Sequence, residues 1–190
     1  EPTSNTGAAG PKWIPYTALL KRQFQRGISA WMGNLFWSRP QLLRGKHFWS
    51  ITPPPRRPQY TRGGLPLGFE EDSAYLGGWS RRLVNSLMAV PAGGAHQSDY
   101  LGATLSHLLA CPGLRLVSVW SPTYWLLLLE RLQADYGLTS SQAWPQLACL
   151  SCWGDGYSAR YLEPLQRSHP GLWIQKKGLI ATEAFVSLPW

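Results

Sequence analysis

The chain has 190 residues, a net charge of +8 and a hydrophobic content of 44%. This composition excludes a disordered chain or a membrane-embedded one, and the longest aliphatic run, 126–129, is far too short to span a bilayer. The basic pairs Arg56-Arg57, Arg81-Arg82 and Lys176-Lys177 are short, so we interpret them as solvated surface. A nucleic-acid groove is the alternative, because the 11 Trp residues could supply stacking platforms.

The first element is a loop over residues 3–12 that combines small and hydroxyl side chains and ends on Lys12. Loops of this kind let backbone N–H groups and hydroxyls approach phosphate oxygens closely. The same composition is typical of an ordinary flexible turn, so the loop alone does not decide between the two. Since the chain opens at Glu1 and stops at Trp190 in an apolar run, we expect it to be part of a longer protein.

A long amphipathic helix is predicted next. Thr17 is a candidate N-cap, and the apolar residues that follow recur at steps of three or four and end before Pro40. The stripe consists of Leu20, Phe24, Ile28, Trp31 and Leu35. A short strand is then predicted at 48–51, and Pro and Gly residues over 53–68 indicate an irregular but ordered loop.

Helical and extended patterns alternate over the rest of the chain. The predicted helices are 79–87, 98–109 with Ser98 as N-cap, 123–132 with Ser121 as N-cap and Pro122 at its first position, and 159–167; the predicted extended segments are 114–120, 147–153, 173–174 and 179–188. This alternation predicts an α/β fold with a mainly parallel sheet flanked by helices. Ligands of such sheets bind at the carboxyl ends of the strands, where the loop 3–12, the turn 154–156 and the segment around 182–183 would meet.

The three cysteines are Cys111, Cys149 and Cys152. The last two form a C-x-x-C, a spacing found in redox and zinc sites. They lie inside the predicted strand 147–153, where an offset of three places the side chains on opposite faces, and no second ligand pair follows at zinc spacing. We therefore expect buried free thiols in a reducing compartment, the cytoplasm.

The segment 178–183 ends in Thr182-Glu183. Together with the loop 3–12 it resembles the adenylate-forming enzymes of the firefly luciferase-like superfamily, whose signature loop is Ser/Thr-Ser-Gly-Thr-Ser/Thr-Gly-x-x-Lys and whose later motif is Tyr-x-x-Thr/Ser-Glu. More narrowly, the chain resembles the bacterial members of the auxin-responsive promoter family of acyl-acid amido synthetases. The stretches that carry this resemblance occur in family order at 1–17, 48–51, 64–69, 72–77, 119–123, 152–155 and 177–183.

The resemblance implies a fold and a reaction. Residues 1–190 would be a fragment of the large N-terminal adenylation domain, without the preceding segment, the ribose-binding Asp motif and the C-terminal domain. A carboxylic acid would attack the α-phosphate of ATP in the presence of Mg²⁺ to form an acyl-adenylate, and the amine of an amino acid or another amine would then take the acyl group. The implied partners are these small molecules, with no membrane, and the fragment by itself is expected to be inactive.

The same resemblance assigns residues. Thr182 would contact the α-phosphate and Glu183 would bind Mg²⁺, a cation that prefers carboxylate and phosphate oxygens. The residues that would bind ATP are Thr3, Ser4, Asn5, Thr6, Gly7, Lys12, Gly154, Asp155, Gly156 and Ala181. Three positions depart from the family pattern: Asn5 replaces a Gly, Gly7 replaces a hydroxyl residue, and Leu179 replaces an aromatic residue.

Ser121, Thr123 and Tyr124 are our candidates for the acyl pocket, although a capped core helix explains these residues equally well. An alternative for the whole chain is a non-catalytic or degenerate family member that acts as a binding module, for which nucleic acid is the ligand to consider. We rank this alternative second because it ignores the ordered series of motifs.

Overall fold

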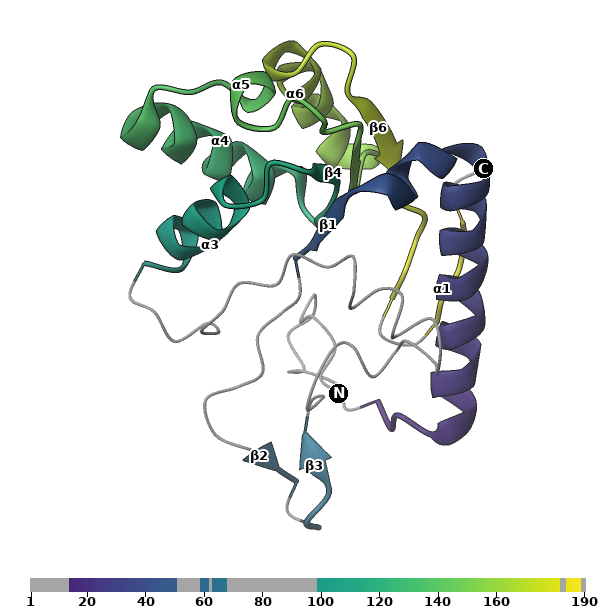
Figure 1. Cartoon of the computed structure of the whole chain (residues 1–190). Coiled ribbons are helices and arrows are strands. Elements are labelled where there is room, and N and C mark those ends of the chain that lie inside the picture. The colour runs from purple at the N-terminus through teal and green to yellow at the C-terminus, as the bar shows by residue number, and fades with distance from the viewer. Residues whose placement is uncertain (1–13, 51–58, 62, 68–98, 182–183, 189–190) are drawn as a thin grey trace.

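A four-stranded parallel sheet lies between two layers of helices (Figure 1). The computed structural model describes residues 14–50, 59–61, 63–67, 99–181 and 184–188. The strands stand in the order β1-β4-β5-β6, and every neighbouring pair is parallel. Their bounds are Lys46–Trp49 for β1, Leu114–Ser118 for β4, Cys149–Cys152 for β5 and Trp173–Lys176 for β6. The predicted α/β architecture with a parallel sheet is therefore confirmed.

Helix α1 (Ala18–Ser38) covers one face of the sheet and stands apart from the other helices (Figure 1). The hydroxyl of Thr17 accepts a 3.2 Å hydrogen bond from the backbone N–H of Leu20, which confirms the predicted N-cap. The predicted stripe faces inward, with Phe24, Trp31 and Leu35 buried. At the amino ends of the strands the interface is apolar and consists of Leu35, Leu42, Leu116 and Cys149.

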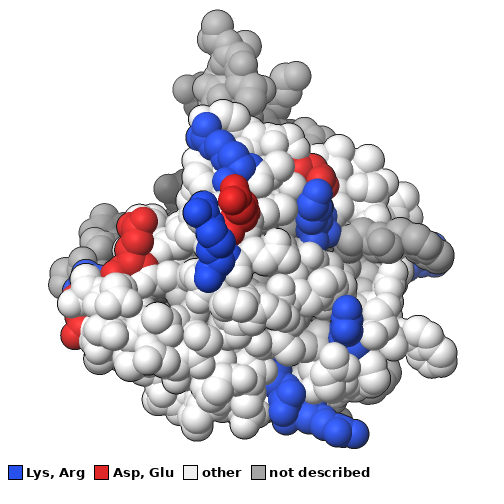
Figure 2. Space-filling model, turned by 90° about the horizontal axis from the view of Figure 1, so that it is seen from above, with Lys and Arg blue, Asp and Glu red and all other residues white. Residues whose placement is uncertain are grey.

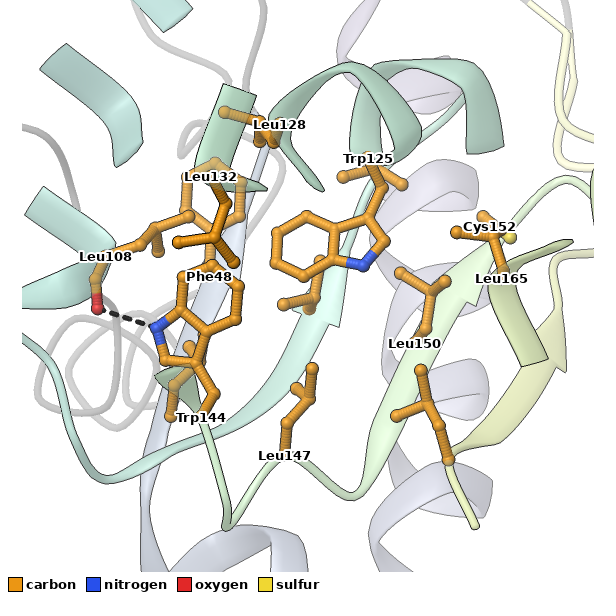
Figure 3. Close-up of a cluster of buried hydrophobic side chains, with 14 of the residues drawn as sticks. Phe48, Leu108, Trp125, Leu128, Leu132, Trp144, Leu147, Leu150, Cys152 and Leu165 are labelled. Atoms are coloured by element: carbon orange, nitrogen blue, oxygen red, sulfur yellow. Dashed lines mark hydrogen bonds between the residues drawn. The ribbon is translucent and has the colours of Figure 1, made fainter. Parts of the chain in front are cut away.

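The other face of the sheet is covered by helices α3 (Tyr100–Leu109), α4 (Pro122–Tyr136) and α6 (Leu162–Ser168). Two tryptophans lie at the centre of this core, Trp125 and Trp144, with ring centroids 5.3 Å apart and no exposed surface (Figure 3). The indole N–H of Trp144 donates a 2.9 Å hydrogen bond to the carbonyl of Leu108. This bond fixes the loop before β5 against the end of α3.

The predicted N-cap of α4 is confirmed, whereas that of α3 is wrong. Ser121 accepts from the backbone N–H of Thr123 at 3.3 Å and Pro122 occupies the first turn, as predicted. The cap of α3 is Asp99, whose carboxylate accepts from Gly102 at 2.9 Å, so the expectation of Ser98 as the cap is wrong. The helix begins one residue later than the pattern suggested, and the aspartate reaches its first turn.

The remaining elements are short. They are the 3-10 helix η1 (Pro40–Arg44), the antiparallel pair β2 (Gln59–Tyr60) and β3 (Pro66–Leu67), helix α5 (Ser140–Ala143) and the 3-10 helix η4 (Gly156–Tyr161). The predicted helix 159–167 thus divides into a 3-10 turn followed by α6. The predicted helix 79–87 and the loop 3–12 lie outside the described residues.

No helix within the described ranges is both long and apolar enough to cross a membrane.

The C-terminal segment folds back on itself through a bridge between Ile180 and Phe185, so the single extended run predicted over 179–188 is wrong. The Phe185 ring packs against Phe24 of α1, with centroids 6.4 Å apart. The segment therefore closes the layer between α1 and the sheet.

Candidate functional site at the carboxyl edge of the sheet

The parallel strands all end at one edge of the sheet, and the segments that follow β4, β5 and β6 run together there. The backbone N–H of Trp153 donates to the carbonyl of Trp120 at 2.9 Å, and that of Lys177 donates to Cys152 at 2.8 Å. These bonds extend the ladder one residue past each strand. Residues 154–156 thus lie at this edge, as predicted, while the loop 3–12 and residues 182–183 lie outside the described residues, so the meeting of the three segments remains a prediction.

The turn after β5 is built around Gly154, which is buried. A Cβ atom there would lie 2.7 Å from Cγ of Lys176 and 3.0 Å from Cδ1 of Leu162, so the position accepts only glycine without a shift. The next residue, Asp155, is exposed and its carboxylate accepts a 3.2 Å hydrogen bond from Lys176. Gly156 has φ 56° with open space around it, so its backbone faces solvent.

The segment after β6 forms a narrow hairpin. Gly178 lies so close to the returning chain that a Cβ atom would be 2.1 Å from the carbonyl oxygen of Ser187. Ala181 and Ala184 exchange backbone hydrogen bonds of 2.9 and 3.3 Å. Thr182 and Glu183, which connect these two residues, lie outside the described part of the chain, as do Thr3, Ser4, Asn5, Thr6, Gly7 and Lys12. Their assigned roles remain predictions.

The three candidates for the acyl pocket separate into two groups. The hydroxyls of Ser121 and Thr123 lie 2.6 Å apart at the start of α4, on the edge that carries the other loops. Tyr124 packs against the core beneath α4, and burial raises the pKa of its phenol to about 12. The helix cap accounts for the first two contacts, and the assignment of a pocket here remains a prediction.

A buried lysine at this edge was missed by the sequence reading. Lys177 was assigned with Lys176 to a solvated basic pair, which is wrong: Lys177 is 7% exposed, whereas Lys176 lies at the surface. Successive residues of a strand point to opposite faces, so two adjacent lysines cannot share one environment. The alternation of Trp173, Gln175 and Lys177 on one face of a buried strand was the available signal.

The ammonium of Lys177 lies among indole rings and one hydroxyl. Its Nζ donates a 2.7 Å hydrogen bond to Oγ of Ser118 and lies 4.7 Å from the ring centres of both Trp31 and Trp120 and 5.9 Å from that of Trp49. The rings come from α1, from the segment after β4 and from β1, so four elements converge on one amine. Within the described ranges no carboxylate lies within 4.0 Å of this nitrogen.

The surroundings shift the ionisation of this lysine. Burial lowers its pKa from 10.5 to about 7, because the charged form loses its hydration. The faces of the three indole rings attract the ammonium and offset part of that cost. Burial also raises the pKa of Cys149 to about 12 and that of Cys152 to about 11, so both neighbours are neutral thiols at pH 7.

The two cysteines lie on opposite faces of β5, as predicted: Cys149 packs towards α1 and Cys152 packs in the core beneath α4. A disulfide between them is therefore excluded by geometry. No cluster of three or more metal-ligating side chains occurs among the residues that the structure describes.

A concave region lies at the opposite edge of the sheet, where the strands begin. It is a groove of about 510 Å³, lined by residues that include Arg39, Gln41, Arg115, Gln146 and Trp173. The guanidinium of Arg39 stacks over the Trp173 ring, 4.9 Å from its centre.

Viewed from above, basic side chains occur singly or beside acidic ones rather than as a continuous stripe (Figure 2).

Comparisons with known proteins identify the fold. No family model matches the chain, and no curated protein matches it in sequence. Two solved structures are similar: one titled "AtGH3.15 acyl acid amido synthetase in complex with 2,4-DB", with a TM-score of 0.75 and 15% identity, and one titled "GH3.15 acyl acid amido synthetase", with 0.67 and 17%. Both matches cover 98% of this chain but only 41% of the other. The fold is that of part of an amido synthetase, as the resemblance in sequence predicted.

Proposed function

We propose that this chain is the part of an ATP-dependent acyl-acid amido synthetase that binds the nucleotide. The observation that supports the proposal is that the described stretches of the family resemblance near 119–123, 152–155 and 177–181 meet at the carboxyl edge of a sheet with the fold of part of an acyl acid amido synthetase. The turn 154–156 and the hairpin that leads to Ala181 both begin at this edge. This is the edge at which ligands of open parallel sheets bind.

In this proposal residues 154–156 and Ala181 border the adenine, as the family resemblance implies. Gly156 presents an open backbone, and the exposed carboxylate of Asp155 can accept from a hydroxyl or an amino group. Bound ATP with Mg²⁺ would supply an electrophilic phosphorus and a cation that neutralises phosphate charge. Glu183 would hold that cation, and the loop 3–12 with Thr182 would hold the phosphates.

The work of the chain itself would be positioning. The close approach of Gly178 to Ser187 and the packing of Phe185 on α1 hold the described arms of the hairpin together and against the helix. Phosphate chemistry of this kind depends mainly on orientation and charge neutralisation rather than on covalent help from the protein. The acyl acid and the amine acceptor are small molecules that the structure does not identify.

Magnesium-dependent exchange of pyrophosphate into ATP, in the presence of a carboxylic acid, tests this proposal in the full-length protein. Glu183→Gln is expected to reduce exchange by at least about 100-fold, since the metal loses a charged ligand. The matched control is Glu163→Gln on the exposed surface of α6, which should leave exchange unchanged. Wild-type exchange in a folded Glu183→Gln variant would overturn the metal assignment.

A further inference from the structure

One row of side chains crosses the sheet on the face covered by α1. The strand register places Trp49 beside Ser118, Ser118 beside Ser151, and Ser151 beside Gln175. All four lie on the face covered by α1. Leu116 in β4 and Cys149 in β5 pack against that helix, and Ser118 and Ser151 follow them by two residues, so they point to the same side. Lys177 follows Gln175 on the same face and reaches across to Ser118. The layer between α1 and the sheet is thus apolar at one end and polar at the other.

The row contains hydrogen-bonding groups that no described residue satisfies. The hydroxyl of Ser151 has no exposed surface and no partner, and the buried indole N–H of Trp49 has none either. Lys177 uses one of its N–H groups on Ser118, which leaves two more when the amine is charged. By contrast, Trp31 at the same end is satisfied through Gln175, at 3.1 Å. Unsatisfied buried donors of this kind call for an explanation.

In the strand register Ser118 stands between Trp49 and Ser151, and Lys177 reaches this row at Ser118. Neighbouring strands are about 4.8 Å apart, so the hydroxyl of Ser151 lies about one strand spacing from that of Ser118, which Lys177 contacts. The Trp49 ring centre is 5.9 Å from Nζ of Lys177. Every unsatisfied group here is a donor or a hydroxyl that can donate, and the one charge is positive. A ligand that complements this set is an anion, and a metal cation is disfavoured.

We propose that Lys177, Ser151 and Trp49 form a buried oxyanion subsite that accepts the carboxylate or phosphate group of a small molecule. The outer wall of this subsite is Trp120, which is 38% exposed and packs on the Trp153 ring at 5.6 Å, so a ligand would enter by displacing these two rings. The subsite does not depend on the proposed adenylating function, since it uses none of the residues assigned to ATP or Mg²⁺.

An anion bound in this subsite would change the pKa of Lys177, which can be measured. The titratable groups nearest to Lys177 are the thiols of Cys149 and Cys152, both neutral at pH 7, while α1 and β1 contribute only the indoles of Trp31 and Trp49. An anion beside the amine favours its protonated form, so binding would raise the pKa of Lys177 from about 7. Lys176, on the opposite face and paired with Asp155, would not respond.

The experiment follows the Cε resonances of ¹³C-labelled lysine in the full-length protein between pH 5 and 11, alone, with sodium acetate, or with inorganic phosphate at constant ionic strength. The Lys177 signal is assigned by its loss in Lys177→Arg. We expect a saturating anion to raise the pKa of Lys177 by at least about 1, a tenfold preference for the charged amine, and to leave that of Lys176 unmoved. Ser151→Ala and Trp49→Phe should weaken the anion's effect several-fold.

The two probes separate the possible sources. A shift with acetate alone assigns a carboxylate ligand, a shift with phosphate alone assigns a phosphate group, and a shift with both assigns a general oxyanion site. If neither anion moves the Lys177 midpoint, or if Ser151→Ala and Trp49→Phe leave the effect intact, the subsite is overturned and the row is an internal structural tie. Pyrophosphate exchange is measured separately, so this failure would not be confused with failure of the proposed function.

Discussion

Lys177 donates a 2.7 Å hydrogen bond to Ser118, a residue 59 positions earlier in the chain, and the bond is buried. It joins the end of β6 to the end of β4 across the intervening strand β5. The amine is surrounded by indole rings and has no carboxylate partner among the described residues, so its burial in the charged form is costly.

Replacing Lys177 by methionine should stabilise the protein at neutral pH by about 1–4 kcal/mol, since a buried unpaired charge gives way to an apolar chain of similar length. The amine has a pKa of about 7 when folded and 10.5 when unfolded, so between these values the unfolded chain holds a proton that the folded chain lacks. The free energy of unfolding of the wild type should therefore rise as pH increases from 7 to 10.5.

Chemical denaturation at several pH values tests this, and the rise should be absent in Lys177→Met. Lys176→Met is the control: this side chain is exposed beside Asp155, so the wild-type pH dependence should remain. If Lys177→Met retains the alkaline rise, another group is responsible and the assignment to Lys177 is wrong.

Gly27→Ala on α1 should destabilise the protein, against the usual rule that alanine favours a helix. A Cβ atom at Gly27 would lie 2.5 Å from the ring of Phe185, so the hairpin 178–188 would be pushed off the helix. We expect a loss of about 1–3 kcal/mol, measured by thermal unfolding. Gly33→Ala on the same helix meets nothing within 4 Å and should stabilise by up to about 1 kcal/mol. Equal effects of the two substitutions would contradict the packing of Phe185.

Trp144→Phe should cost about 2 kcal/mol of stability. The substitution removes the indole donor to the carbonyl of Leu108, which keeps only its backbone donors such as the N–H of Cys111, and leaves space beside Trp125 (Figure 3). The free energy of unfolding in urea measures the loss. Trp37→Phe is the control, because Trp37 is 90% exposed and its change should stay within about 0.5 kcal/mol. A neutral Trp144→Phe would show that the hydrogen bond contributes little.

The predictions of single elements succeeded where a short pattern carries the physics. The Thr17 cap, the apolar stripe of α1 and the Ser121-Pro122 start of α4 depend on spacing within one helix, and the structure confirms them. The cap of α3 was misplaced by one residue, because Ser98 and Asp99 are both good caps and local chemistry does not choose between them. The opposite faces of Cys149 and Cys152 followed from strand periodicity alone.

The environment of Lys177 could not be derived in the same way. Its partners come from three separate parts of the chain: Trp31 from α1, Trp49 from β1, and Ser118 with Trp120 from the end of β4. They meet only when α1 packs on the sheet in a particular register. Two adjacent lysines look alike in a sequence, and burial of one of them is a property of the packed layers. The sequence by itself determined the class of fold, the starts of α1 and α4 and the motifs that resemble adenylating enzymes, because these depend on periodicity and short-range chemistry. Only the tertiary structure decided which of the two lysines is buried and which polar groups surround the buried amine, because desolvation depends on contacts between distant segments.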